Sequence, residues 1–234
     1  PSKIEEYRLK RLSQGELFNP GKGRKPRKGV SKSTVNREMA LLKHIYNKGA
    51  EWEKVLSNPV KLIKFYSEKE NKRTRYLEKE QKVKLLELCP LPTRRIVFFA
   101  LNTGMRQGEI LNLKWKDIDF KNLLIKVTRS KSGKPRYVNI NSELADMLKS
   151  IPTVSEYVFG TKEGRAKFTL YRKHFEKAVK DAGISDFRWH DLRHDYASTL
   201  VMKGIDLKTV SELLGHSSTA MTERYSHLSP AHKR

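Results

Sequence analysis

Residues 103–110 read T-G-M-R-Q-G-E-I. Gly104 is expected to end one helix and to let a second begin, which places Arg106 in the first turn of the second helix. A helix N-terminus favours anions, and an arginine there adds a forked donor for phosphate oxygens. Glu109 follows three residues later on the same helical face, where it is placed to orient Arg106. Taken alone, the two residues fit an ordinary surface Arg–Glu pair equally well.

The chain around this stretch is predicted to be mainly α-helical, with one small antiparallel β-hairpin. Helical periodicity covers residues 78–88, 93–103, 106–112, 142–149, 169–181, 190–203, 206–214 and 218–225. Residues 123–128 and 135–140 are rich in Val, Ile and Leu, and residues 129–134 between them are typical of a hairpin turn. Asp206 and Gly215 are expected to begin and end the helix that precedes His216.

Two domains are predicted, covering residues 1–72 and 73–234. A highly charged stretch without apolar residues, Ser67 to Arg75, is typical of a linker between them. The first domain is predicted to be helical over residues 1–12 and from a cap at Ser33 or Thr34 to about Glu51. The chain starts at Pro1, and we expect this first domain to lack an N-terminal portion.

A basic loop lies between the two helices of the first domain. It has six cationic residues and no acidic one, namely Lys22, Arg24, Lys25, Arg27, Lys28 and Lys32. A solvated flexible loop is the simple interpretation. In a DNA-binding chain the same loop suits a path along the phosphates.

The charge of the whole chain favours a nucleic-acid partner. Its 234 residues include 49 Lys and Arg against 26 Asp and Glu, a formal net charge of +23. Phosphates neutralise such an excess with release of counterions. A membrane surface is the alternative polyanion, but no stretch is apolar enough to span a bilayer. The N-terminal residues have no signal-like pattern, so a cytoplasmic, nucleoid-associated location is expected.

Several reactive residues follow in the second half of the chain. His190 and Arg193 are spaced to share one helical face, which suits a single phosphate. His216 lies just past a predicted helix end, and Tyr225 follows it by a short segment. Tyr225 is preferred to Tyr196 as a nucleophile for that reason, although a core tyrosine is the simple interpretation of either.

The predicted hairpin turn contains two lysines that suit proton transfer. Lys131 is placed to protonate a leaving 5′-oxygen, with Lys134 as its local competitor.

The chain has no phosphate-cradling glycine loop, no carboxylates with metal-ligand spacing and a single cysteine, Cys89. Neither a metal nor another cofactor is therefore expected.

Five motifs in order resemble the tyrosine recombinase (phage integrase) family: T-G-M-R-Q-G-E-I, K-S-G-K-P-R-Y-V, H-D-L-R-H-D-Y-A, L-L-G-H and T-E-R-Y-S-H. The resemblance runs from about Thr103 to His227, and residues 36–52 and 58–60 extend it more weakly to a helical core-binding domain. It implies that the two domains form a C-shaped clamp around duplex DNA.

The resemblance also implies roles for single residues. Tyr225 would form a 3′-phosphotyrosyl link, Arg106 and Arg193 would bind the scissile phosphate, and Lys131 would be the general acid. His190 would assist as general base, His216 would hydrogen-bond the phosphate, and Glu109 would support the site.

At the level of the whole reaction, the resemblance implies site-specific recombination. Four protomers would exchange strands between two DNA sites through a Holliday junction, with accessory DNA-bending proteins as further partners. The role would be that of an integrase or excisionase of a phage or mobile element, or of a Xer-like recombinase that resolves chromosomes. Three rivals remain: a type IB-like topoisomerase, an architectural DNA-binding protein without chemistry, and an RNA-binding protein.

Overall fold

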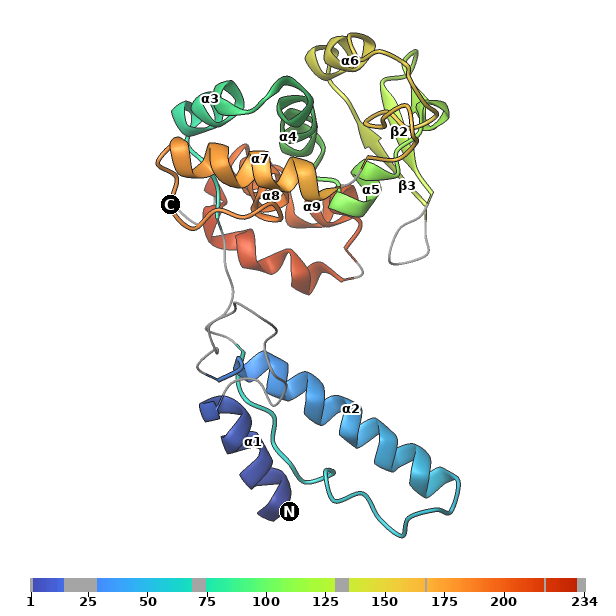
Figure 1. The fold of residues 1–234 in the computed structure, drawn as a ribbon, viewed down its shortest axis with the longest axis vertical. Coiled ribbons are helices and arrows are strands. Elements are labelled where there is room, and N and C mark those ends of the chain that lie inside the picture. The colour runs from blue at the N-terminus through green and yellow to red at the C-terminus, as the bar shows by residue number, and fades with distance from the viewer. Residues whose placement is uncertain are drawn as a thin grey trace. The chain divides into compact units, whose positions relative to one another are not determined.

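The structure is a computed structural model, and it describes residues 2–14, 29–68, 75–128, 135–166, 168–216 and 218–230 (Figure 1). The chain divides into two compact units, Pro1–Lys72 and Arg73–Arg234. None of the described helices is both long enough and apolar enough to cross a lipid bilayer.

The first unit is built on helices α1 (Ser2–Gln14) and α2 (Lys32–Glu51). Val35 and Met39 are buried on one face of α2. The cap of α2 is Ser31, whose hydroxyl accepts from the backbone amide of Thr34 at 3.2 Å. The predicted cap at Ser33 or Thr34 was therefore wrong, because the extended backbone that a cap needs occurs at Ser31.

Polar contacts hold the segment after α2 against the two helices. The buried Asn36 donates to the carbonyl of Tyr66 and accepts from its backbone amide, both at 2.9 Å. The guanidinium of Arg8 lies 4.2 Å from the centre of the Tyr66 ring and donates to the carbonyl of Lys64 at 2.9 Å. These contacts fix the end of the first unit in a region with little apolar burial.

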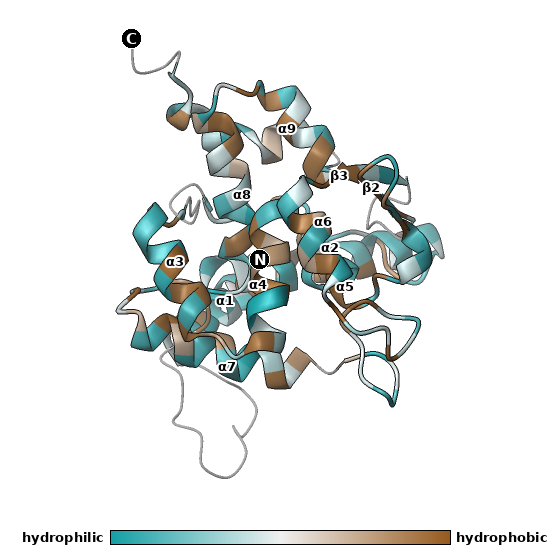
Figure 2. Cartoon of the chain, turned by 90° about the horizontal axis from the view of Figure 1, so that it is seen from above, coloured by the Kyte–Doolittle hydropathy of each residue, from teal (hydrophilic) through white to brown (hydrophobic). Residues whose placement is uncertain are grey.

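The second unit is organised around helix α4 (Leu91–Thr103). Helices α3 (Lys79–Leu88), α6 (Ser142–Lys149), α7 (Phe168–Asp181) and α8 (Asp191–Met202) all contact it. Buried residues of α4 recur at helical spacing, among them Ile96, Val97 and Ala100. Helices α3 and α7 contain both teal and brown residues (Figure 2), and Leu85 of α3 and Phe175 of α7 are buried in the core.

A three-stranded antiparallel sheet packs beside the helices in the order β1-β2-β3. Its strands are β1 (Ile118–Asp119), β2 (Leu124–Val127) and β3 (Arg136–Asn139), with Ile125 opposite Val138. The prediction of a mainly α-helical fold with a small antiparallel sheet is confirmed. Strand β1 and the 3-10 helix η2 (Trp115–Asp117) before it were not predicted. Neither element is long enough to show a period in the sequence.

The C-terminal part of the second unit contains α9 (Leu207–Leu214) and two 3-10 helices, η3 (Thr219–Met221) and η4 (Glu223–Leu228). The predicted cap at Asp206 and the left-handed Gly215 at the helix end are confirmed. The predicted α-helix over residues 218–225 was wrong, since the chain there is 3-10 helical. It packs on α8 and α9 in a separate small core that includes Val210, Leu214 and Tyr225.

Truncation of Phe175 tests the main core. Its side chain is fully buried on α7 and meets the Trp189 ring edge-on at 5.1 Å. Phe175→Ala is expected to lower the free energy of unfolding by about 3–5 kcal/mol in urea titrations. The control is Leu170→Ala on the same helix, where the side chain is 56% exposed and a change within about 0.5 kcal/mol is expected. Equal losses for the two variants would contradict this description of the core.

Candidate active site

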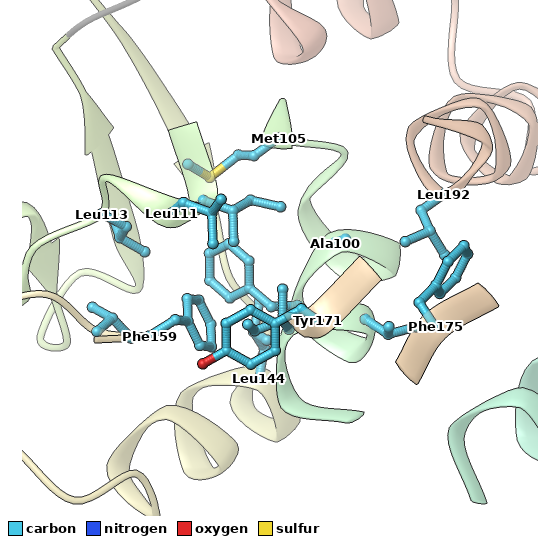
Figure 3. Close-up of a cluster of buried hydrophobic side chains, with 14 of the residues drawn as sticks. Ala100, Met105, Leu111, Leu113, Leu144, Phe159, Tyr171, Phe175 and Leu192 are labelled. Atoms are coloured by element: carbon cyan, nitrogen blue, oxygen red, sulfur yellow. The ribbon is translucent and has the colours of Figure 1, made fainter. Parts of the chain in front are cut away.

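The helix break at Gly104 places Arg106 at the start of helix α5 (Gln107–Leu111). Gly104 has a φ of 59°, and a Cβ there would lie 2.4 Å from the Tyr196 ring and 3.0 Å from the Leu214 side chain. Only glycine fits both that conformation and that space. Arg106 is the residue that precedes α5 rather than part of its first turn as predicted. The buried Met105 and Leu111 on either side anchor this segment in the core (Figure 3).

Glu109 reaches back to Arg106 from the first turn of α5. One carboxylate oxygen accepts from the Arg106 backbone amide at 2.8 Å, and the other accepts from its guanidinium at 3.1 Å. This reciprocal contact fixes the arginine backbone and its side chain together. The Glu109 side chain is only 5% exposed, so an ion pair of this kind must be nearly fully hydrogen-bonded.

A second arginine, Arg136 of β3, also binds the carboxylate of Glu109. Its guanidinium donates to both carboxylate oxygens, at 2.9 and 2.7 Å, and its side chain is only 10% exposed. Burial alone would raise the pKa of Glu109, but hydrogen bonds from Arg136 and from the Arg106 backbone outweigh it and leave this pKa below its ordinary value. The sequence did not single out Arg136, because nothing local shows that a strand residue faces α5.

Three arginines from different segments bind the end of α9. Arg136 donates to the carbonyl of Leu213 at 3.2 Å, Arg193 to that of Leu214 at 2.6 Å, and Arg106 to that of Gly215 at 3.0 Å. A helix C-terminus leaves such carbonyls unpaired and carries partial negative charge, so cationic donors are favourable there. These contacts fix the end of α9 and therefore the position of His216, which directly follows it.

Arg193 is the most deeply buried cation of this group. It is 5% exposed, and its second donor nitrogen bonds the carbonyl of Gly104 at 2.7 Å. Burial, and then the charge of Arg106, lower the pKa of Arg193 to about 9. The guanidinium remains charged at neutral pH, but the surroundings are short of negative charge. An anion that approached these arginines would be bound favourably for this reason.

Tyr225 lies in η4 with its hydroxyl against the ring of His194. The tyrosine is 1% exposed, and its hydroxyl is hydrogen-bonded to Nδ1 of His194. Burial raises the pKa of Tyr225 to about 12, and burial is also the main cause that lowers the pKa of His194 to about 4. The histidine is therefore neutral at neutral pH, and the tyrosine hydroxyl keeps its proton.

The partner of the Tyr225 hydroxyl is His194 rather than His190, the residue that the family resemblance offered as its base. His190 lies next to it instead, with its ring edge-on to His194 at 5.0 Å. Burial, and then the charge of Arg193, lower the pKa of His190. His194 stands four residues after His190 on α8, so the spacing of two histidines one helical turn apart was the available signal.

His216 follows Gly215 and is held by a hydroxyl. Its Nδ1 lies 2.7 Å from Oγ1 of the buried Thr222, which directs Nε2 to the opposite side of the ring. Burial lowers the pKa of His216 to about 4, and the charges of Arg193 and Arg106 add to the effect. The ring is therefore neutral at neutral pH and suited to hydrogen bonding.

The second unit thus brings most of the sequence-predicted residues to one place. Arg106, Glu109, His190, Arg193, His216 and Tyr225 lie around the start of α5, one face of α8 and the end of α9. Lys131, Lys22, Arg24, Lys25, Arg27 and Lys28 lie outside the described residues. Lys32 is exposed and is the first residue of α2 in the first unit. The described residues contain no group of three His, Cys, Asp or Glu side chains placed to hold a metal ion.

Comparisons with known proteins identify the family of this chain. Residues 75–232 match the phage integrase family. The integrase of Salmonella phage P22 is 34% identical over 98% of this chain, which spans only 61% of that protein. The catalytic domain of bacteriophage HP1 integrase is 32% identical, with a TM-score of 0.56, over 69% of this chain and 92% of that domain. The Tn1549 transposon integrase, solved with transposon right end DNA, shares the fold at a TM-score of 0.77 and 20% identity, over all of this chain and 83% of that one.

The family match covers well over half of the chain, so the chain belongs to the phage integrase family.

Removal of Arg136 is expected to destabilise the protein. Arg136→Ala leaves the buried Glu109 with a single arginine, and losing one partner of a buried ion pair typically costs about 3–5 kcal/mol. The control is Arg172→Ala on α7, whose pair with Glu176 is exposed and where at most about 1 kcal/mol is expected. Urea titrations of both variants provide the measurement. A loss for Arg136→Ala no larger than that of the control would show that the pair is not essential to the fold.

The two histidines with low pKa values predict a loss of stability at acid pH. His194 and His216 have folded pKa values of about 4 against an ordinary value of 6.5. The unfolded chain therefore binds more protons between these values, and stability falls as the pH decreases through that window. Urea titrations between about pH 5 and 7 should give a smaller pH slope for His194→Gln than for the unchanged chain. Identical slopes would contradict the assignment for His194.

Proposed function

We propose that this protein cleaves and rejoins DNA strands at specific sites, with Tyr225 as the nucleophile and a covalent 3′-phosphotyrosyl intermediate. The observation that carries the proposal is that Arg106 and Arg193 meet at the end of α9, next to His216, while Tyr225 packs in the same small core as α9 and is hydrogen-bonded to the neutral His194. Phosphoryl transfer depends mainly on positioning and on stabilisation of developing negative charge. This site offers both from protein side chains.

In the proposed step, the Tyr225 oxygen attacks the scissile phosphorus and the bond from phosphorus to the 5′-oxygen breaks. The tyrosine proton passes to the neutral His194, whose Nδ1 is already hydrogen-bonded to the tyrosine hydroxyl. The leaving 5′-oxygen takes its proton from Lys131. Arg106 and Arg193 hold the charge on the non-bridging oxygens, and His216 adds a hydrogen bond. Attack by a 5′-hydroxyl reverses these changes, so no net input of energy is needed.

Glu109, Arg136 and His190 act around this step rather than on the phosphate. Glu109 and Arg136 keep Arg106 in place through the contacts described above. His190, edge-on to His194, helps to hold the base next to the tyrosine. This assignment of roles differs from the expectation that His190 itself is the general base.

DNA binding is proposed to involve both units of the chain. The first unit, as a core-binding domain, and the second, as a catalytic domain, would enclose a duplex in a C-shaped clamp. Lys22, Arg24, Lys25, Arg27, Lys28 and Lys32 would contact its phosphates, and the net charge of +23 supports this role. Such work on DNA places the protein on the nucleoid in the cytoplasm.

For the complete reaction we propose site-specific recombination by four protomers on two duplexes, through a Holliday junction and with accessory DNA-bending proteins. The similarity to the P22 integrase supports an integrase or excisionase of a phage or mobile element. Similarity to a protein named tyrosine recombinase XerA supports a Xer-like role as the second candidate.

Covalent trapping tests the proposed chemistry. The protein would be incubated with a nicked suicide duplex that carries the attachment site flanking its gene, and adducts would be resolved on a denaturing gel. The unchanged chain and Tyr196→Phe are expected to form an adduct, whereas Tyr225→Phe should reduce it below detection because the nucleophile is lost.

Peptide mass spectrometry would then assign the linkage. A phosphotyrosyl peptide that contains Tyr225 is the expected product. Tight binding of the unchanged chain to the site without any adduct would instead favour an architectural DNA-binding protein. An adduct that reseals without exchange between two sites would favour a topoisomerase.

A further inference from the structure

A polar cleft lies next to the candidate active site, on the side of α5 that faces the sheet. It has a volume of about 810 Å³, and Met105, Arg106 and Glu109 belong to its lining. Strand β2 contributes Lys126 and Thr128 to the lining. The cleft thus shares Arg106 with the place where the proposed function puts the scissile phosphate.

The cleft is lined by an excess of cations. Lys114, Lys116, Lys126 and Arg165 come from three separate segments, and Arg106 adds a fifth positive charge. Among the residues that the structure describes, two acidic side chains, Glu109 and Asp117, belong to the lining. Both already accept hydrogen bonds from the protein, Glu109 from two arginines and Asp117 from the backbone amide of Lys114 at 3.2 Å.

The wall of the cleft is held by backbone hydrogen bonds. The amide of Trp115 donates to the carbonyl of Glu156 at 3.1 Å, and that of Val158 donates to the carbonyl of Leu113 at 2.9 Å. On this wall Lys114 pairs with Glu156 at 2.8 Å and lies 5.1 Å from the centre of the Tyr157 ring. Because these hydrogen bonds fix the backbone of the wall, the segments that carry its lysines need little rearrangement when a ligand binds.

The outer cations are exposed. Lys116, Lys126 and Arg165 are each accessible to solvent. Arg165 donates to the side-chain oxygen of Asn112 at 2.9 Å, a neutral partner that does not cancel its charge. A cleft of this size accommodates a nucleotide-sized group rather than a single small ion, and its charge selects an anion.

We propose that this cleft is a second phosphate-binding site, which holds the DNA backbone next to the scissile phosphate on the side of the sheet. The inference rests on the proposed function for the identity of the ligand. Lys116, Lys126 and Arg165 contact the backbone phosphate and sugar, and Arg106 links this site to the one that holds the scissile phosphate. Because the contacts are made with the backbone, they are independent of base sequence.

Chemical footprinting of lysines on the full chain tests the site without knowledge of the recombination target. The protein is acetylated briefly, alone and with a mixed-sequence duplex, and each lysine is followed by mass spectrometry. Acetylation of Lys116 and Lys126 is expected to fall several-fold with the duplex, while Lys149 on α6 and Lys177 on α7 keep their reactivity. Inorganic phosphate and a mononucleotide serve as parallel ligands, and protection by these alone would assign the cleft to a free phosphate compound and overturn the proposal.

Charge-removal variants supply the second measurement. The triple variant Lys116→Gln, Lys126→Gln and Arg165→Gln is compared with Lys149→Gln, Arg172→Gln and Lys177→Gln, which removes the same charge from exposed positions of α6 and α7. The salt dependence of duplex binding, plotted on logarithmic axes, should become shallower by about 1 to 2 for the first variant because one or two phosphate contacts are lost. The second variant should keep the slope of the unchanged chain.

The possible results separate this inference from the proposed function. Equal reactivity of Lys116 and Lys126 with and without a bound duplex, or equal slopes for the two variants, would overturn the second site. A chain that binds the duplex with protection of the cleft but forms no adduct at Tyr225 would retain the site and lose the proposed chemistry. A chain that does not bind duplex DNA at all would overturn both.

Discussion

Three successive carbonyl oxygens at the end of α9 each accept a hydrogen bond from a different arginine. Arg136 comes from the sheet, Arg193 from α8, and Arg106 from the segment before α5. These bonds use the unpaired acceptors of a helix end to join parts of the unit that are distant in sequence. His216 directly follows the end of the same helix, so the position of the candidate site depends on these three hydrogen bonds.

The three arginines at the end of α9 concentrate positive charge where little negative charge balances it. Glu109 is shared by Arg136 and Arg106, while Arg193 bonds only to neutral carbonyl groups in the contacts that define its position. Burial, and then the charge of Arg106, lower the pKa of Arg193 to about 9. A bound phosphate would relieve this imbalance, so the same contacts that order the fold prepare the site for an anion. The adjoining cleft extends the positive surface along α5.

The candidate nucleophile belongs to a hydrophobic core as well as to the site. Tyr225 packs with Val210 and Leu214 and is almost fully buried, while its hydroxyl contacts His194. Burial gives the hydroxyl a high pKa and gives the histidine a low one. Both groups of the pair are therefore neutral at neutral pH, with the proton on the tyrosine.

The sequence by itself determined the elements that depend on local geometry. Gly104 and Gly215 adopt left-handed backbone conformations, Asp206 caps α9, and the spacing of His190 and Arg193 follows one helical face. It also carried the motifs of the family. Only the tertiary structure decided that Arg136 binds Glu109 and that His194, rather than His190, meets Tyr225. The physical reason is that these partners are 27 and 31 residues apart in the chain, and their meeting depends on how β3 and η4 pack rather than on any local period.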